Sequence, residues 1–144
     1  IIDHYHTGFV LRHLDTVRRS LAADFIEAPL QAGYRFYLSR LFTSRGVPKF
    51  TPESTYPIDI HSSAEAILSL CQLGPRLGGL DHLSPAFDFT QHKMRTENGW
   101  YIAAIRRSAR REVEIRIPYM RWGQAWMMLA LARLQAALSY KPIT

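Results

Sequence analysis

The sequence predicts an all-α domain in which antiparallel helical hairpins form an incomplete double ring, with one small β-hairpin between the fourth and fifth helices. Three observations lead to this fold class. Apolar residues recur with helical spacing along most of the chain, strongly apolar helical segments alternate with amphipathic ones, and similar helix starts recur at intervals of 55 and 60 residues. A double ring requires this alternation, because its inner helices contact neighbours on all sides and its outer helices on one side.

The first two predicted helices form a hairpin. Residues 5–21 carry apolar side chains at helical spacing, while arginine, histidine and aspartate fill the opposite face. Residues 28–42 repeat this spacing, and Pro29 falls in the first turn, where its missing N–H is tolerated. The segment 43–60 contains too many glycine and proline residues for a helix, so we expect a long loop or a short strand pair there.

The third predicted helix covers residues 62–73. Ser62 and Glu65 have the spacing of a capping box, in which each side chain satisfies a free amide at the helix start. Gly74-Pro75 is expected to end this helix. The segment is strongly apolar, which is typical of an inner helix.

The last three elements are a weakly amphipathic helix, a β-hairpin and an apolar helix. Ser84-Pro85 and Asn98-Gly99 have the composition of a helix start and a helix stop. In residues 100–117, β-branched and aromatic residues alternate partly with polar ones around Ser108-Ala109, which predicts the hairpin. Residues 119–138 are apolar nearly all round, so this helix is expected to be buried on most sides.

Composition excludes several classes of protein. The chain has 144 residues with 47% hydrophobic and 12% aromatic content, which is typical of one globular domain. No window approaches the roughly 18 apolar residues of a membrane span. The single cysteine, Cys71, excludes an internal disulfide and suits a reducing compartment such as the cytoplasm. The net charge of +6 favours anionic partners, but no nucleic-acid-binding motif accompanies it.

Three helix starts form an imperfect repeat: DHYHTGFVLRHL from Asp3, DIHSSAEAILSL from Asp59 and YMRWGQAWMMLALARL from Tyr119. The first two share an aspartate followed by a histidine, whereas the third has Arg-Trp in place of the histidine. Inner helices of a ring run parallel, so their N-terminal ends meet at one mouth, where helix dipoles favour anions. The residues expected to meet there are Asp3, His6, Asp59, His61, Arg121, Trp122 and Gln124.

These starts resemble the (α/α) toroid proteins of the six-hairpin glycosidase-like group, of the kind encoded with polysaccharide biosynthesis genes. The resemblance rests on DHYHTGF (3 to 9), YPIDIHSSAEAI (56 to 67) and IPYMRWGQAWM (117 to 127). It implies saccharide binding in a central cleft but supplies no reaction, because members of this architecture include hydrolases, lyases, epimerases and non-carbohydrate enzymes. A complete toroid has about six hairpins. Residues 1–144, which begin without methionine, are therefore expected to be a single domain forming the C-terminal part of a longer toroid.

The candidate catalytic residues are His61, Asp59 and His6. Imidazole titrates near neutral pH, and Asp59 is placed to fix the tautomer of His61; Asp3 stands in a similar relation to His6. The alternative is structural: Asp59 caps the helix and His61 packs against a tyrosine. Two histidines suit proton transfer at a sugar carbon, whereas paired carboxylates suit glycoside hydrolysis, and the sequence leaves both open.

Most of the candidate substrate-binding residues lie at the start of the predicted helix 119–138. Arginine binds carboxylates or phosphates in bidentate fashion, and a tryptophan face suits the apolar side of a sugar ring. Trp126, one turn after Trp122, is expected to belong to the core. The substrate-binding candidates are Arg121, Trp122, Gln124, Asp3 and the rim residues Tyr56 and Tyr119.

We expect no metal and no cofactor. The short H-x-H and D-x-H spacings occur by chance, and the chain has neither HExxH nor a cysteine pair. The expected ligand is a saccharide, for which the basic charge favours an acidic one, and no nucleic acid. The competing hypothesis is a non-catalytic glycan- or peptide-binding helical scaffold. In either case an open arc of hairpins exposes apolar flanks of its inner helices, which missing N-terminal hairpins or a partner would cover.

Overall fold

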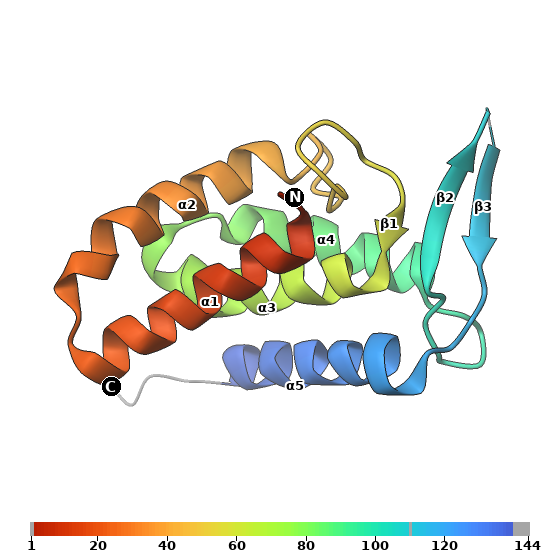
Figure 1. Ribbon diagram of the computed structural model, residues 1–144. Coiled ribbons are helices and arrows are strands. Elements are labelled where there is room, and N and C mark those ends of the chain that lie inside the picture. The colour runs from red at the N-terminus through yellow and green to blue at the C-terminus, as the bar shows by residue number, and fades with distance from the viewer. Residues whose placement is uncertain (1, 110, 140–144) are drawn as a thin grey trace.

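The computed structural model describes residues 2–109 and 111–139, which fold into a mostly helical unit with a small antiparallel sheet (Figure 1). In this described part there are five α-helices and three strands. The helices are α1 (His4–Leu21), α2 (Glu27–Arg40), α3 (Ile60–Leu77), α4 (Leu83–Phe89) and α5 (Ala125–Ser139), and the strands are β1 (Ile58–Asp59), β2 (Ala104–Ser108) and β3 (Arg111–Ile115). None of these helices is long and apolar enough to cross a membrane.

Helices α1, α3 and α5 run in the same direction and begin at the end of the molecule nearer the sheet, while α2 and α4 run back (Figure 1). Helix α3 is central, because it packs against α1, α4 and α5. One face of α3 contributes Leu70 and Leu73 to a core shared with α1 and α2, and another contributes Ile67 and Leu68 to a core shared with the sheet and α5. The parallel arrangement expected of inner helices is present, but the described helices do not close a ring.

The start of α3 differs from the predicted capping box. Asp59 is the N-cap, and its carboxylate accepts a hydrogen bond of 2.7 Å from the His61 amide. Ser62 and Glu65 are buried instead, and Glu65 pairs with Arg12 of α1. The capping box was wrong because the aspartate comes earlier and the helix therefore starts two residues before Ser62.

The end of α3 and the start of α4 also differ from the prediction. Helix α3 continues through Pro75 and stops at Gly78, which has a φ of +88°. In the last turn Leu77 packs against the core and Arg76 pairs with Asp15 and Glu27, and these contacts offset the hydrogen bond that proline removes. Helix α4 begins at Leu83, so Ser84 lies inside it and donates to Asp88 rather than capping the helix. A π-helical turn, Thr90–Met94, then extends α4.

The predicted β-hairpin is confirmed as β2 and β3, and the short strand β1 adds a third member to the sheet. Ile58 pairs with Ile105, and Asp59 pairs with Ala104. Strand β1 lies immediately before α3, so the sheet holds the start of that helix. The proline-rich segment before β1 is a long loop, closed by a bridge between Phe42 and Pro48.

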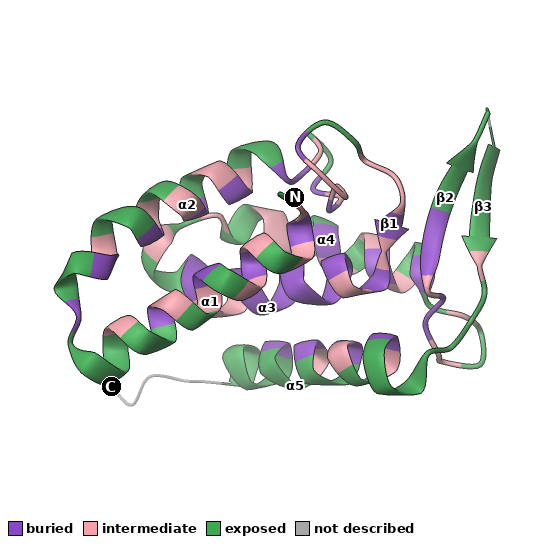
Figure 2. Cartoon of the chain, in the orientation of Figure 1, coloured by how far each residue is buried: buried purple, intermediate pink, exposed green. Residues whose placement is uncertain are grey.

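Helix α5 is more exposed than its sequence predicted. Its buried residues are Met127, Ala130 and Leu134, whereas Met128 is 72% exposed and Leu138 is 77% exposed. The prediction of burial on most sides was wrong because, in the described part of the chain, α3 is its principal helical neighbour. Figure 2 shows the resulting exposed side of α5.

A buried histidine, His4, ties the start of α1 to α2. Its Nδ1 donates to the Leu41 carbonyl at 2.8 Å, so its Nε2 accepts from the Tyr37 hydroxyl at 2.6 Å. Burial in this apolar site lowers the pKa of His4 to about 3. Sequence analysis assigned His4 no role, since a buried histidine has no distinct spacing signal.

Acid is expected to destabilise the fold through His4. Its pKa is lower in the folded state than in the unfolded chain, so the unfolded chain takes up the proton first and stability falls as pH drops below about 6.5. The free energy of unfolding should decrease by about 2 kcal/mol between pH 7.5 and pH 5 from this group. Denaturant titrations at both pH values check this. The His4→Asn variant keeps a donor for the Leu41 carbonyl, and its free energy of unfolding should fall less between the two pH values than that of the wild type. An equal fall in both proteins would contradict this prediction.

Candidate functional site

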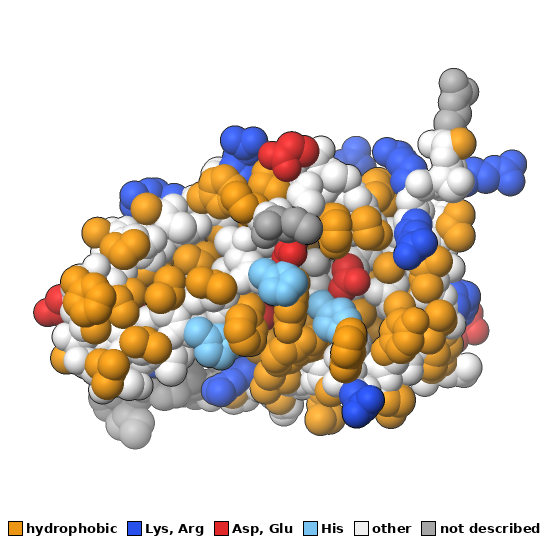
Figure 3. Space-filling model, viewed as in Figure 1, with side chains coloured by type: hydrophobic (Ala, Val, Ile, Leu, Met, Phe, Trp, Pro, Cys, Tyr) orange, Lys and Arg blue, Asp and Glu red, His pale blue; other side chains and the backbone are white. Residues whose placement is uncertain are grey.

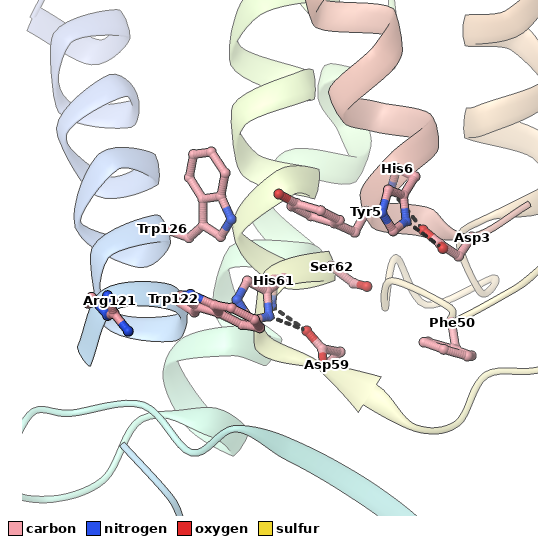
Figure 4. Close-up of a pocket in the computed structure, with 10 residues that line it drawn as sticks. All are labelled: Asp3, Tyr5, His6, Phe50, Asp59, His61, Ser62, Arg121, Trp122 and Trp126. Carbon is pink, nitrogen blue, oxygen red and sulfur yellow. Dashed lines mark hydrogen bonds and ion pairs between the residues drawn. The ribbon is translucent and has the colours of Figure 1, made fainter. Parts of the chain in front are cut away.

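A cavity of about 610 Å³ lies where α1, α3 and α5 begin (Figure 4). The repeat predicted this meeting point, and six of the seven residues expected there line the cavity. Four residues that were not among those seven also line it: Tyr5, Ser62 and Trp126 from the repeat segments and Phe50 from the loop before β1. The full lining is Asp3, Tyr5, His6, Phe50, Asp59, His61, Ser62, Arg121, Trp122 and Trp126.

Two aspartate–histidine pairs of similar construction face this cavity. Asp3 accepts from the His6 amide at 2.7 Å and binds His6 Nδ1 at 2.7 Å. Asp59 accepts from the His61 amide at 2.7 Å and binds His61 Nδ1 at 2.8 Å. A carboxylate only accepts, so in the neutral form of each imidazole Nδ1 carries the proton and Nε2 keeps its lone pair. Both imidazoles are thereby oriented as proton acceptors.

Each aspartate therefore acts both as a helix cap and as the partner of an imidazole. The catalytic and the structural interpretation of Asp59 and His61 are therefore compatible. Asp59 binds the imidazole and caps the helix, and His61 also packs edge-on against Tyr5 with ring centroids 5.7 Å apart. The pairs differ in exposure. The His6 side chain is 72% exposed, whereas that of His61 is 20% exposed. His61 is thus the better shielded of the two bases.

Aromatic rings line the space around the two imidazoles. The Tyr5 ring lies 5.0 Å from His6, 5.7 Å from His61 and 6.1 Å from Trp126, measured between centroids. Trp122 lies 6.1 Å from His61 and is 67% exposed, so its ring is open to a ligand. Trp126 packs against the core as expected and also lines the cavity. Figure 4 shows Tyr5 pointing from α1 toward Trp126 of α5.

Arg121 and Trp122 are placed by a π-helical turn, Met120–Gln124, that precedes α5. Gly123 lets this turn pack closely on α3, since a Cβ there would lie 2.9 Å from Ile60 Cγ2. Arg121 forms no ion pair within residues 2–109 and 111–139. Its guanidinium is therefore available to an anionic ligand.

The remaining predicted binding residues lie outside this cavity. Gln124 is held by Tyr101, because its Oε1 accepts from the Tyr101 amide at 2.9 Å and its Nε2 donates to the Tyr101 carbonyl at 2.8 Å. Sequence spacing alone does not distinguish this structural use from ligand contact. Tyr56 donates to Glu112, which raises the pKa of its hydroxyl, and Tyr119 lines a neighbouring cavity.

Metal-ligating and nucleophilic groups are sparse. The described residues contain no group of three or more histidine, cysteine, aspartate or glutamate side chains placed to hold a metal ion. Cys71 is partly buried, and burial raises the pKa of its thiol, which disfavours the nucleophilic thiolate. The two histidine–aspartate pairs are therefore the chemically distinctive groups of the cavity.

A scan against protein-family models, a search of curated proteins and a search of solved structures each found no match.

Proposed function

We propose that this protein is a carbohydrate-active protein that acts on an oligo- or polysaccharide by proton transfer in the cavity at the starts of α1, α3 and α5. The observation that carries the proposal is that two carboxylate-held imidazoles, His6 and His61, face one cavity that aromatic rings line, among them the exposed ring of Trp122. The resemblance to the (α/α) toroid group supports the same ligand class. It also supports the arrangement of these helices as an incomplete (α/α) toroid.

The cavity lining favours a saccharide over a purely apolar ligand. Sugars present apolar C–H faces and a ring of hydroxyl groups, so they bind sites that combine aromatic faces with polar side chains. Trp122 and Tyr5 supply the aromatic faces, while Ser62 and the two imidazoles supply polar partners. Arg121 adds a cation suited to an acidic sugar.

The histidines favour proton transfer at carbon over hydrolysis by paired carboxylates. Asp3 and Asp59 each bind an imidazole and a helix amide, so neither is a free acid or nucleophile. In the proposed step His61 Nε2 takes a proton from a sugar carbon next to an electron-withdrawing group. The C–H bond breaks, and its electron pair is delocalised into that group. Return of a proton gives an epimer, and loss of a β-leaving group gives an unsaturated sugar.

A non-catalytic binding module is the second candidate function. The observation that favours it is that Asp3 and Asp59 are the N-caps of α1 and α3, which explains both aspartates without catalysis. The high exposure of His6 points the same way, because an exposed base is less readily tuned for catalysis. This module would use the same cavity for a glycan.

Trp122→Ala is expected to weaken saccharide binding about tenfold, since a stacked ring contributes on the order of 1 to 2 kcal/mol. A panel of neutral and acidic oligosaccharides is screened with the wild type, and affinities of the best ligand are then measured by calorimetry. Phe25→Ala is the control, because Phe25 is 82% exposed and lies outside the cavity. Equal affinities of the two variants, or no binding by any saccharide, would overturn the proposal.

A further inference from the structure

A second cavity, of about 730 Å³, adjoins the first. The two cavities share four lining residues: Asp59, His61, Arg121 and Trp122. His61 and its aspartate therefore lie at the junction of two hollows. A ligand that occupies both cavities would have the imidazole beside its middle, as an oligosaccharide has in a cleft with several subsites.

The β-hairpin forms one wall of the second cavity. Asp59 pairs with Ala104, which fixes the hairpin beside the histidine–aspartate pair. Alternate residues of a strand point to the same side, and both Ala104 and Arg106 line the cavity. The sheet thus places Arg106 in the wall of the same cavity that Arg121 lines from the turn before α5.

The second cavity is cationic. Within the described ranges, 2–109 and 111–139, neither Arg106 nor Arg121 forms an ion pair. The one acid in its lining, Asp59, already binds the His61 imidazole. The acids of the neighbouring strand have other partners, since Glu112 binds Tyr56 and Glu114 binds Arg116. Figure 3 shows basic side chains around the projecting hairpin. Two unneutralised guanidinium groups favour an anionic ligand.

We infer that this second cavity is a subsite for an anionic sugar unit, adjacent to the unit held beside His61. The inference rests on the proposed function and adds to it a substrate class, an acidic oligosaccharide spanning both cavities. Tyr119 and Trp122, which are 52% and 67% exposed, offer ring faces to the same sugar unit. The acidic group, a carboxylate or a sulfate, binds Arg106 and Arg121.

Arg106→Gln tests this subsite most directly, because Arg106 lines the second cavity and not the first. The ligands are short uronic-acid oligosaccharides, the same oligosaccharides after carboxyl reduction, and sulfated neutral oligosaccharides. We expect about fivefold to tenfold weaker binding of the acidic ligands and little change for the neutral ones. The uronate and sulfate ligands distinguish the two sources of charge. Arg111→Gln removes the same charge from the same hairpin outside both cavities and serves as the control.

The possible results separate this inference from the proposed function. If Arg106→Gln affects the acidic ligands no more than Arg111→Gln does, the subsite is refuted. It is also refuted if the wild type binds acidic and carboxyl-reduced forms equally, and in both cases saccharide binding itself stands. If the wild type binds no saccharide, the proposed function fails and the subsite fails with it.

Discussion

His61→Ala is expected to reduce turnover by about 10² to 10⁴ while leaving saccharide affinity nearly unchanged. The substitution removes the lone pair of Nε2, which accepts the proton in the proposed step, but it leaves Trp122 and Arg121 in the cavity. Incorporation of deuterium from D₂O into the bound oligosaccharide measures proton transfer at carbon directly. It detects epimerisation and reversible exchange at that carbon, while ultraviolet absorbance of the unsaturated sugar detects elimination.

Two further variants refine this test. His92→Ala removes an imidazole from the π-helical turn after α4, outside the cavity, and should keep full activity. Asp59→Asn keeps a good N-cap but removes the charge that holds Nδ1–H, so it should lower turnover with little loss of stability. Unchanged deuterium incorporation in His61→Ala would exclude His61 as the base. Loss of affinity in His61→Ala, with no turnover by the wild type on any saccharide screened, would favour the binding module.

Glu65→Ala is expected to lower the free energy of unfolding by about 3 kcal/mol, the largest single stability effect in the α1–α3 interface. The Glu65 side chain is 1% exposed and receives two bonds from Arg12, Nε to Oε1 at 2.6 Å and Nη2 to Oε2 at 2.9 Å. Ser69 donates a third bond at 2.9 Å. Removing the carboxylate leaves the Arg12 guanidinium, 13% exposed, without its partner.

Denaturant unfolding measures this loss, and two variants control it. Glu53→Ala removes an exposed carboxylate that has no ion pair among the described residues, and should change stability by less than about 0.5 kcal/mol. The double variant Arg12→Met/Glu65→Leu should recover most of the loss, because it leaves no unpaired charge. A loss below about 1 kcal/mol in Glu65→Ala would show that the pair does not hold α1 against α3.

Sequence patterns predicted the elements whose signals are long and local. Helical spacing located α1, α2 and α3, and the β-hairpin followed from alternation around a turn. The repeat of an aspartate followed two or three residues later by a histidine predicted that the starts of α1 and α3 lie together, and both starts line the same cavity. The pattern succeeded because an aspartate cap fixes the position of the following histidine relative to the helix axis.

The features that the sequence did not predict depend on distant parts of the chain. Strand β1 has two residues, too few for a periodic signal, and it exists because β2 pairs with it. Phe50 lines the cavity from an irregular loop. Gln124 does not reach the cavity, because its side chain is hydrogen-bonded to the backbone of Tyr101, which lies 23 residues away in the chain. The hydrophobicity of α5 indicated burial, but burial also requires neighbours, and the described part of the chain leaves one side of α5 open.

We propose that His6 and His61 face one ligand-binding cavity as Nδ1-protonated imidazoles. Long-range ¹H–¹⁵N spectra of the imidazole groups, recorded during titration with the saccharide selected by calorimetry, test it most directly. Both rings should show the Nδ1–H tautomer, and both should shift with the same affinity, while His82 and His92 stay unchanged. Saturating ligand that moves neither ring, or moves one without the other, would contradict the claim.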